Sequence, residues 1–112
     1  MGHKNLRVYQ NSLNLVEKIY KITGKFPDEE KFGLISQMRR AAVSIPSNIA
    51  EGAAKTGNKE FKRFIDISLG SLMELGTQIE ICCRLEYITD RDNIDPLFNK
   101  VKAELIGLRR KA

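Results

Sequence analysis

The sequence predicts an all-α protein, an antiparallel up-down-up-down four-helix bundle. Apolar residues recur at spacings of three and four in four separate stretches, and no stretch alternates as a strand would. Short connections rich in Gly, Pro and Asn separate these stretches, so consecutive helices are expected to pack antiparallel to one another. The chain has 112 residues, of which 42% are apolar and 29% charged. We therefore expect one bundle domain spanning residues 1–112.

The first two helices each carry an apolar stripe that ends at a glycine. The first is expected over residues 5–23, before Gly24. Its stripe comprises Leu6, Tyr9, Leu13, Val16 and Tyr20, widened by Leu15, Ile19 and Ile22. The second is expected to begin at Pro27, because proline fits a first helical turn and the acidic residues after it complement the helix dipole. Its stripe is Ile35, Met38, Ala42, Ile45 and Ile49, with Gly52 as its end.

The third helix is predicted to be the longest, with about 26 residues and a length of about 39 Å. It follows the turn residues Thr56-Gly57-Asn58, and Ser68, Gly70, Ser71 and Gly76 would let another helix approach it closely. Its stripe comprises Phe61, Phe64, Ile65, Ser68, Leu72, Leu75, Ile79 and Cys82. The last helix starts near Pro96 and carries Ile94, Leu97, Val101, Leu105 and Leu108.

The basic residues gather toward the two ends of the chain. There are 19 Lys and Arg against 14 Asp and Glu, which gives a net charge of +5 and a pI of about 9.4. Because the first and last helices of such a bundle are neighbours, we expect their basic residues to form one outward surface that contacts nucleic-acid phosphates. These candidate nucleic-acid-binding residues are Lys4, Arg7, Lys18, Lys21, Lys25, Arg109 and Arg110. An ordinary solvated helix face is the alternative.

The composition argues against an enzyme. His3 is the only histidine, so neither a hydrolytic triad nor a histidine-rich metal site is expected, and we predict no catalytic residue, metal or cofactor. The segment from Gly52 to Lys59 resembles a phosphate-binding loop only superficially, because Asn58 separates Gly57 from the lysine. The adjacent Cys82 and Cys83 do not suit a disulfide, and Cys82 falls on the core stripe. With no secretion signal or membrane span, the expected location is the cytoplasm.

A line of polar residues runs along the edge of the second helix. Arg40, Ser44, Asn48 and Glu51 are spaced four, four and three, which places them on one face beside Ile45 and Ile49. We expect a hydrogen-bonded network between helices or between subunits, so that replacing Asn48 or Glu51 destabilises the fold or the assembly. For Glu51 and Glu74, an ion pair with Arg39 or Arg40 is favoured over acid–base chemistry.

These residues carry a resemblance to a known family. The run from Arg40 to Gly52 resembles the motif R-A-A-x-S-I-P-x-N-I-A-E-G of four-helix-bundle proteins encoded in intervening sequences of bacterial 23S ribosomal RNA genes. Phe26-Pro27, Glu60-Phe61, Phe64, the Gly70-Ser71-Leu72 run with Glu74, and Leu85 to Ile88 match as well. On this resemblance Arg40, Ser44, Pro46, Asn48, Glu51, Gly52 and Glu74 form the structural motif of the family.

The resemblance implies a homo-oligomer, with a pentamer preferred. A related branch is the accessory protein of diversity-generating retroelements, a basic pentamer that works with nucleic acid and a reverse transcriptase. We therefore expect a non-enzymatic oligomeric bundle whose partner is RNA or DNA and which binds no membrane. The alternative is a protein-interaction scaffold without affinity for nucleic acid.

Overall fold

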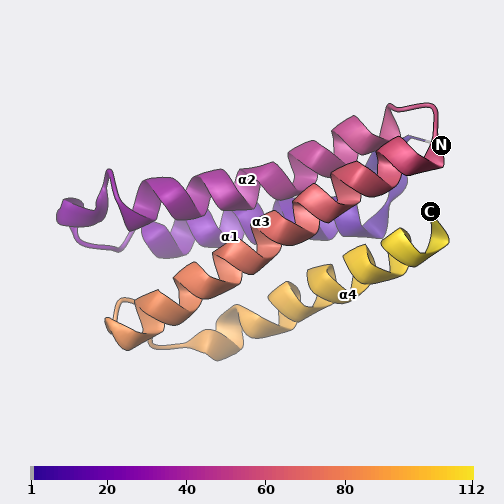
Figure 1. Ribbon diagram of the computed structural model, residues 1–112. Coiled ribbons are helices and arrows are strands. Elements are labelled where there is room, and N and C mark those ends of the chain that lie inside the picture. Colours follow the sequence, from indigo (N-terminus) through magenta and orange to yellow (C-terminus); the bar gives the residue numbers. More distant parts are fainter. Residues whose placement is uncertain (1) are drawn as a thin grey trace.

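The computed structural model describes residues 2–112 and confirms the predicted fold class. Four helices make up the bundle (Figure 1): α1 (Arg7–Thr23), α2 (Leu34–Ala53), α3 (Asn58–Arg84) and α4 (Asp95–Lys111). Short 3₁₀ turns, η1 (His3–Asn5), η2 (Asp28–Glu30) and η3 (Arg91–Asn93), precede α1, α2 and α4. Helix α3 is the longest, at 27 residues, as the sequence predicts.

The helices pack in the order of the chain, α1 against α2, α2 against α3, α3 against α4, and α4 back against α1. This up-down-up-down arrangement brings both termini and the α2–α3 turn to one end of the bundle (Figure 1). The α1–α2 and α3–α4 connections lie at the other end. Side chains that are far apart in the sequence therefore meet at each end.

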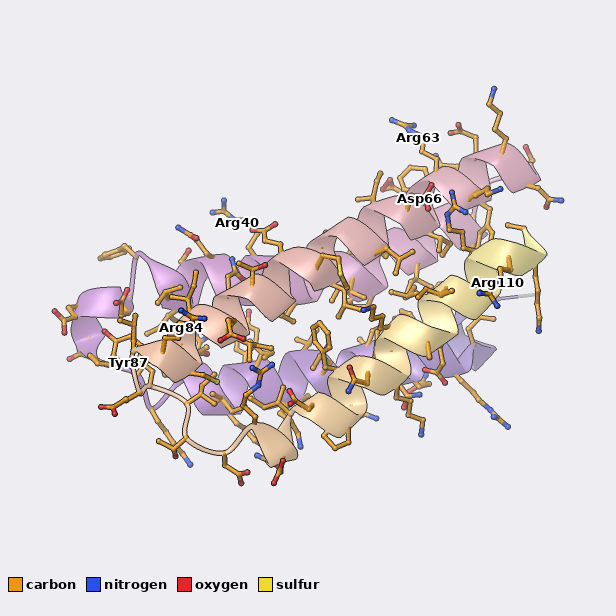
Figure 2. All side chains as sticks on the ribbon, turned by 60° about the horizontal axis from the view of Figure 1, so that its bottom comes forward. Arg40, Arg63, Asp66, Arg84, Tyr87 and Arg110 are labelled. Carbon is orange, nitrogen blue, oxygen red and sulfur yellow. The ribbon has the colours of Figure 1, made fainter. Side chains whose placement is uncertain are left out.

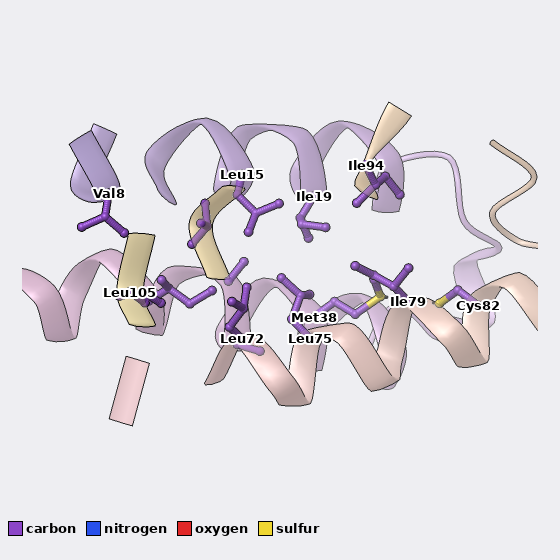
Figure 3. Close-up of a cluster of buried hydrophobic side chains, with 14 of the residues drawn as sticks. Val8, Leu15, Ile19, Met38, Leu72, Leu75, Ile79, Cys82, Ile94 and Leu105 are labelled. Atoms are coloured by element: carbon purple, nitrogen blue, oxygen red, sulfur yellow. Dashed lines mark hydrogen bonds between the residues drawn. The ribbon is translucent and has the colours of Figure 1, made fainter. Parts of the chain in front are cut away.

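One apolar core runs along the bundle axis (Figure 3). Helix α2 contributes Met38, Ile45 and Ile49, and α3 contributes Leu72 and Leu75, all fully buried. The stripe predicted for α4 is also correct, because Val101 and Leu105 are fully buried and Leu97 and Leu108 pack against the core.

The stripe predicted for α1 is correct in part. Leu15 and Ile19 are fully buried, and Leu6, Tyr9, Val16 and Ile22 pack against the core. The buried row also contains Val8, Ser12 and Thr23, which the predicted stripe left out. Two hydroxyls enter this row because they bond within their own helix: Ser12 Oγ donates to the Tyr9 carbonyl at 2.8 Å and Thr23 Oγ1 to the Ile19 carbonyl at 2.7 Å. Tyr20, predicted to be in the core, is 43% exposed.

Helix α2 begins seven residues later than expected. Pro27 instead precedes the 3₁₀ turn η2, and Gly33 breaks the helical conformation before Leu34, with φ −108° and ψ −111°. The Glu30 carboxylate accepts the Tyr87 hydroxyl at 3.0 Å and the Leu34 amide at 3.4 Å. These contacts tie the connection to both α2 and the end of α3.

Candidate nucleic-acid interface

The structure divides the predicted basic surface between the two ends of the bundle. Lys4 and Arg7 lie at the end that holds the termini, whereas Lys21 and Lys25 lie toward the α3–α4 connection. Arg7 and Lys18 are eleven residues apart on one helix, which corresponds to about 16 Å along its axis. Lys18 Nζ donates to the backbone carbonyl of Asn93 at 2.7 Å and to its side-chain oxygen at 3.1 Å. The α1 lysines therefore do not form one continuous surface with the C-terminus.

Arg110 lies at the end opposite to Tyr87 (Figure 2), and Arg109 precedes it in α4. Arg109 forms an ion pair with Asp66 of α3, so its guanidinium is directed toward α3 and not toward α1. The hydrogen bond to Asp66 raises the pKa of Arg109 further. Lys111 shares a shallow pocket with Arg7 and Glu104, which confirms that α1 and α4 are neighbours at this end.

A second group of basic residues, missed by the sequence analysis, joins them. Lys55 precedes α3, and Lys59, Lys62 and Arg63 lie in its first two turns. Their spacing of four, three and one was the signal in the sequence, but only the fold shows that these turns lie beside the two termini. Figure 2 shows Arg63, Asp66 and Arg110 gathered at this end.

We call this surface the basic end. It comprises Lys4, Arg7, Lys55, Lys59, Lys62, Arg63, Arg109, Arg110 and Lys111. Four acidic residues lie among these nine basic ones: Glu51, Glu60, Asp66 and Glu104. Two of the four form ion pairs there, Glu60 with Arg63 at 3.8 Å and Asp66 with Arg109. A third, Glu104, accepts two hydrogen bonds from the Asn11 amide at 2.8 and 3.1 Å. A surplus of positive charge remains.

The opposite end is close to neutral. Residues 17–40 and 80–95, which include the α1 lysines, contain nine acidic and eight basic side chains. Here Arg91 bridges Glu80 at 3.2 Å and Asp95 at 3.4 Å, and hydrogen bonds from Arg84 and Arg91 lower the pKa of Glu80. The surplus of positive charge is thus concentrated at the basic end.

The polar line of α2 divides into a bonded part and an exposed part. Asn48 Nδ2 donates to the Ser44 carbonyl at 2.8 Å and to Ser44 Oγ at 2.9 Å. Ser44 Oγ is in turn 2.8 Å from Ser71 Oγ of α3, and Ser68 Oγ donates to the Ile45 carbonyl at 3.0 Å. These bonds form a network between α2 and α3.

The interpretation of Glu51 and Glu74 as ion-pair partners of Arg39 or Arg40 is wrong within one chain. Glu51, Glu74 and Arg40 are exposed, and within residues 2–112 no ion pair involves any of them. Arg39 instead donates to Thr23 Oγ1 at 3.0 Å and stacks on the Tyr20 ring at 4.4 Å. Glu74 accepts the Gln78 amide at 3.3 Å.

Gly52 and Pro46 of the same motif are buried. A Cβ at position 52 would lie 2.8 Å from Phe64 Cβ, so the glycine lets α2 and α3 approach closely just before their connecting turn. Pro46 lies inside α2 and contributes to a shallow apolar groove with Tyr9 and Leu13 of α1.

Both cysteines are free, and Cys82 occupies the core position that its stripe predicts. Its thiol lies 3.6 Å from the Met38 sulfur, and burial raises its pKa to about 11, with smaller contributions from Cys83 and Glu30. In the described part of the chain, no three His, Cys, Asp or Glu side chains come together as possible ligands of a metal ion. None of the helices in residues 2–112 combines the length and apolar character that a membrane crossing requires.

Similarity to known proteins agrees with the fold and the motif. A solved structure of a protein with unknown function from the S23 ribosomal protein family of Bacteroides thetaiotaomicron VPI-5482 superposes with a TM-score of 0.83. The two share 25% sequence identity, over 92% of this chain and 95% of the other. No curated protein matches the sequence. Residues 4–107 match the family of 23S rRNA-intervening sequence proteins, and the chain therefore belongs to that family.

Proposed function

We propose that this protein binds nucleic acid through its basic end and does so as a homo-oligomer. The observation that carries the proposal is the surplus of positive charge where both termini meet the start of α3. Lysine and arginine side chains that contact phosphates do not read bases, so binding should be largely independent of sequence. In a ring of subunits the basic ends would be repeated, and a weak contact would be strengthened by effective concentration.

The basic end as proposed differs from the surface expected from the sequence. Lys4, Arg7, Arg109 and Arg110 belong to it, while Lys18, Lys21 and Lys25 lie near the opposite end. Lys59 and Lys62 are the better positions for a test, because neither forms an ion pair within residues 2–112.

The proposed assembly uses the outer face of α3. Ile67, Met73, Ile81 and Leu85 are between 40% and 50% exposed there, although they are large and apolar. A Cβ at Gly70, on the same helix, would meet no atom within 4 Å, so a second copy could approach closely at this point. The unpaired charges Arg40, Glu51 and Glu74 have both signs, which suits association of identical chains.

A filter-binding titration with a blunt RNA or DNA duplex at several salt concentrations tests the proposal. The double variant Lys59→Glu/Lys62→Glu should bind at least tenfold more weakly, because each lost charged contact corresponds to about tenfold in affinity. The slope of log K against log salt should decrease by about 0.9 for each lost phosphate contact.

The matched control is Lys100→Glu/Lys102→Glu, which makes the same charge change on an exposed part of α4 outside the basic end. It should retain most of the affinity. Equal losses of duplex affinity in the two double variants would mean that binding depends on the net charge of the protein and not on the basic end. Wild-type protein that binds no duplex at about 50 mM salt, where such contacts are strong, would favour the protein-interaction scaffold.

A further inference from the structure

A cavity of about 450 Å³ opens between the C-terminal half of α1 and the α3–α4 connection. The lining contains the lysines Lys18, Lys21 and Lys25 of α1, and its partly exposed apolar side chains are Ile22 and Tyr87, which we call the apolar floor. Its volume lies within the range of small-molecule sites, which is about 300–1,000 Å³. The cavity lies at the end opposite to the basic end, so any function it has is separate from the one proposed above.

The three lysines form a local positive site at this end of α1. Their spacing of three and four places them on one face of the helix. Within residues 2–112 none of them forms an ion pair with a carboxylate. The two bonds from Lys18 Nζ to Asn93, at 2.7 and 3.1 Å, fix one of the three at the edge of the cavity. Three cations on one face without a carboxylate partner favour an anionic group such as a phosphate.

The rest of the lining suits a flat apolar group with polar edges. Ile88 and Ile94 are 7% and 0% exposed, so the apolar surface open to a ligand comes from the partly exposed Ile22 and Tyr87. The Tyr87 ring is held in place because it packs on Phe26 at 5.3 Å and its hydroxyl donates to Glu30 at 3.0 Å. Asp90 of the α3–α4 connection adds an acceptor, whereas both oxygens of Asn93 already accept Lys18 Nζ.

We propose that this cavity binds one nucleotide, with its phosphate against the lysines and its base over the apolar floor of Ile22 and Tyr87. The carboxylate of Asp90 is then placed to accept hydrogen bonds from ribose hydroxyls. A phosphate alone would leave the apolar floor uncovered, and a nucleoside alone would leave the lysines without an anion. The nucleotide is either free or an unpaired nucleotide of a nucleic-acid strand, since both present the same groups.

Isothermal titration of the intact protein with AMP, inorganic phosphate and adenosine tests the proposal. AMP should bind at least tenfold more tightly than either phosphate or adenosine. Lys21→Glu and Lys25→Glu, both at exposed positions, should each weaken AMP binding about tenfold, because each removes a charged contact. The matched control Lys100→Glu, on an exposed part of α4 outside both the cavity and the basic end, should leave AMP binding unchanged.

A second variant tests the cavity without changing charge. Thr89 is an exposed residue of the lining, and Thr89→Trp would fill the space above the floor. It should abolish the preference of AMP over phosphate while leaving the melting temperature unchanged. If AMP still binds this variant normally, or if neither AMP nor an unpaired oligonucleotide binds the wild type better than phosphate does, the proposal is wrong.

Binding assays with a short unpaired oligonucleotide and with a blunt duplex of the same sequence distinguish a free nucleotide from an unpaired nucleotide of a strand. Binding of the oligonucleotide that Lys21→Glu and Thr89→Trp both weaken, with AMP too weak to measure, assigns the cavity to an unpaired strand. Binding of AMP equal to that of the oligonucleotide assigns it to a free nucleotide. Absence of binding by both overturns the proposal, whatever the duplex does at the basic end.

Discussion

Asn48 supports the polar contact between α2 and α3 from within α2. Its amide donates to both the carbonyl and the hydroxyl of Ser44, and that hydroxyl forms a hydrogen bond with the Ser71 hydroxyl of α3. Glu51 lies on the same face one turn later but is exposed and outside the network. Two residues that look equivalent in the sequence thus have different surroundings.

We predict that Asn48→Leu lowers the free energy of unfolding by about 1–3 kcal/mol, because it leaves half-buried oxygens of Ser44 without their donor. Glu51→Ala, the matched control on the same face, should change it by less than about 0.5 kcal/mol in the monomer. Urea denaturation of the two variants measures both values. A stable Asn48→Leu protein would show that this face is solvated.

At the scale of the elements, helical periodicity was sufficient to predict the number of helices, the length of α3 and the buried stripes of α2, α3 and α4. For α1 it found Leu15 and Ile19 but missed Ser12 and Thr23, which enter the core by bonding their own helix, a feature that no apolar pattern can show. It failed for the start of α2, where Glu30 bonds Tyr87 from the end of α3.

The candidate site was predictable only in part, for a similar reason. Counting charges along the chain found the basic residues of α1 and α4. Which other basic residues lie close to them depends on which helix ends the fold brings together, and a charge count does not show this. Lys55, Lys59 and Lys62 are distant in sequence from both termini, and they belong to the basic end only because the bundle is antiparallel.

Two glycines provide a matched test of how closely the elements approach. Gly52→Ala should lower the free energy of unfolding by about 1–3 kcal/mol, because its Cβ would lie 2.8 Å from Phe64 Cβ and would force α2 and α3 apart. Gly70→Ala should raise it by about 0.5–1 kcal/mol, because alanine is the better helix former and meets no atom within 4 Å. Denaturant midpoints compare the two, and effects of equal sign would contradict this account.

At the scale of the whole molecule, the small-residue face of α3 is used mainly within the chain. Ser68 and Ser71 contact α2, and a Cβ at Gly76 would lie 2.8 Å from the Phe98 ring of α4. Only Gly70 faces open space, beside the exposed apolar residues of α3. The case for assembly therefore rests on those apolar residues and not on the small ones.

We predict that the wild-type protein is a homo-oligomer, with a pentamer preferred, in light scattering behind a sizing column at tens of micromolar. Ile81→Lys should shift it toward the monomer, because a stable interface of about 800 Å² per partner cannot bury an unpaired ammonium at its apolar centre. Val43→Lys is the matched control, since Val43 on α2 is 40% exposed and Ile81 is 42% exposed. It should leave the assembly intact if the outer face of α3 is the interface. A wild-type monomer would contradict the prediction outright, and an assembly broken by Val43→Lys but not by Ile81→Lys would move the interface to the groove between α1 and α2.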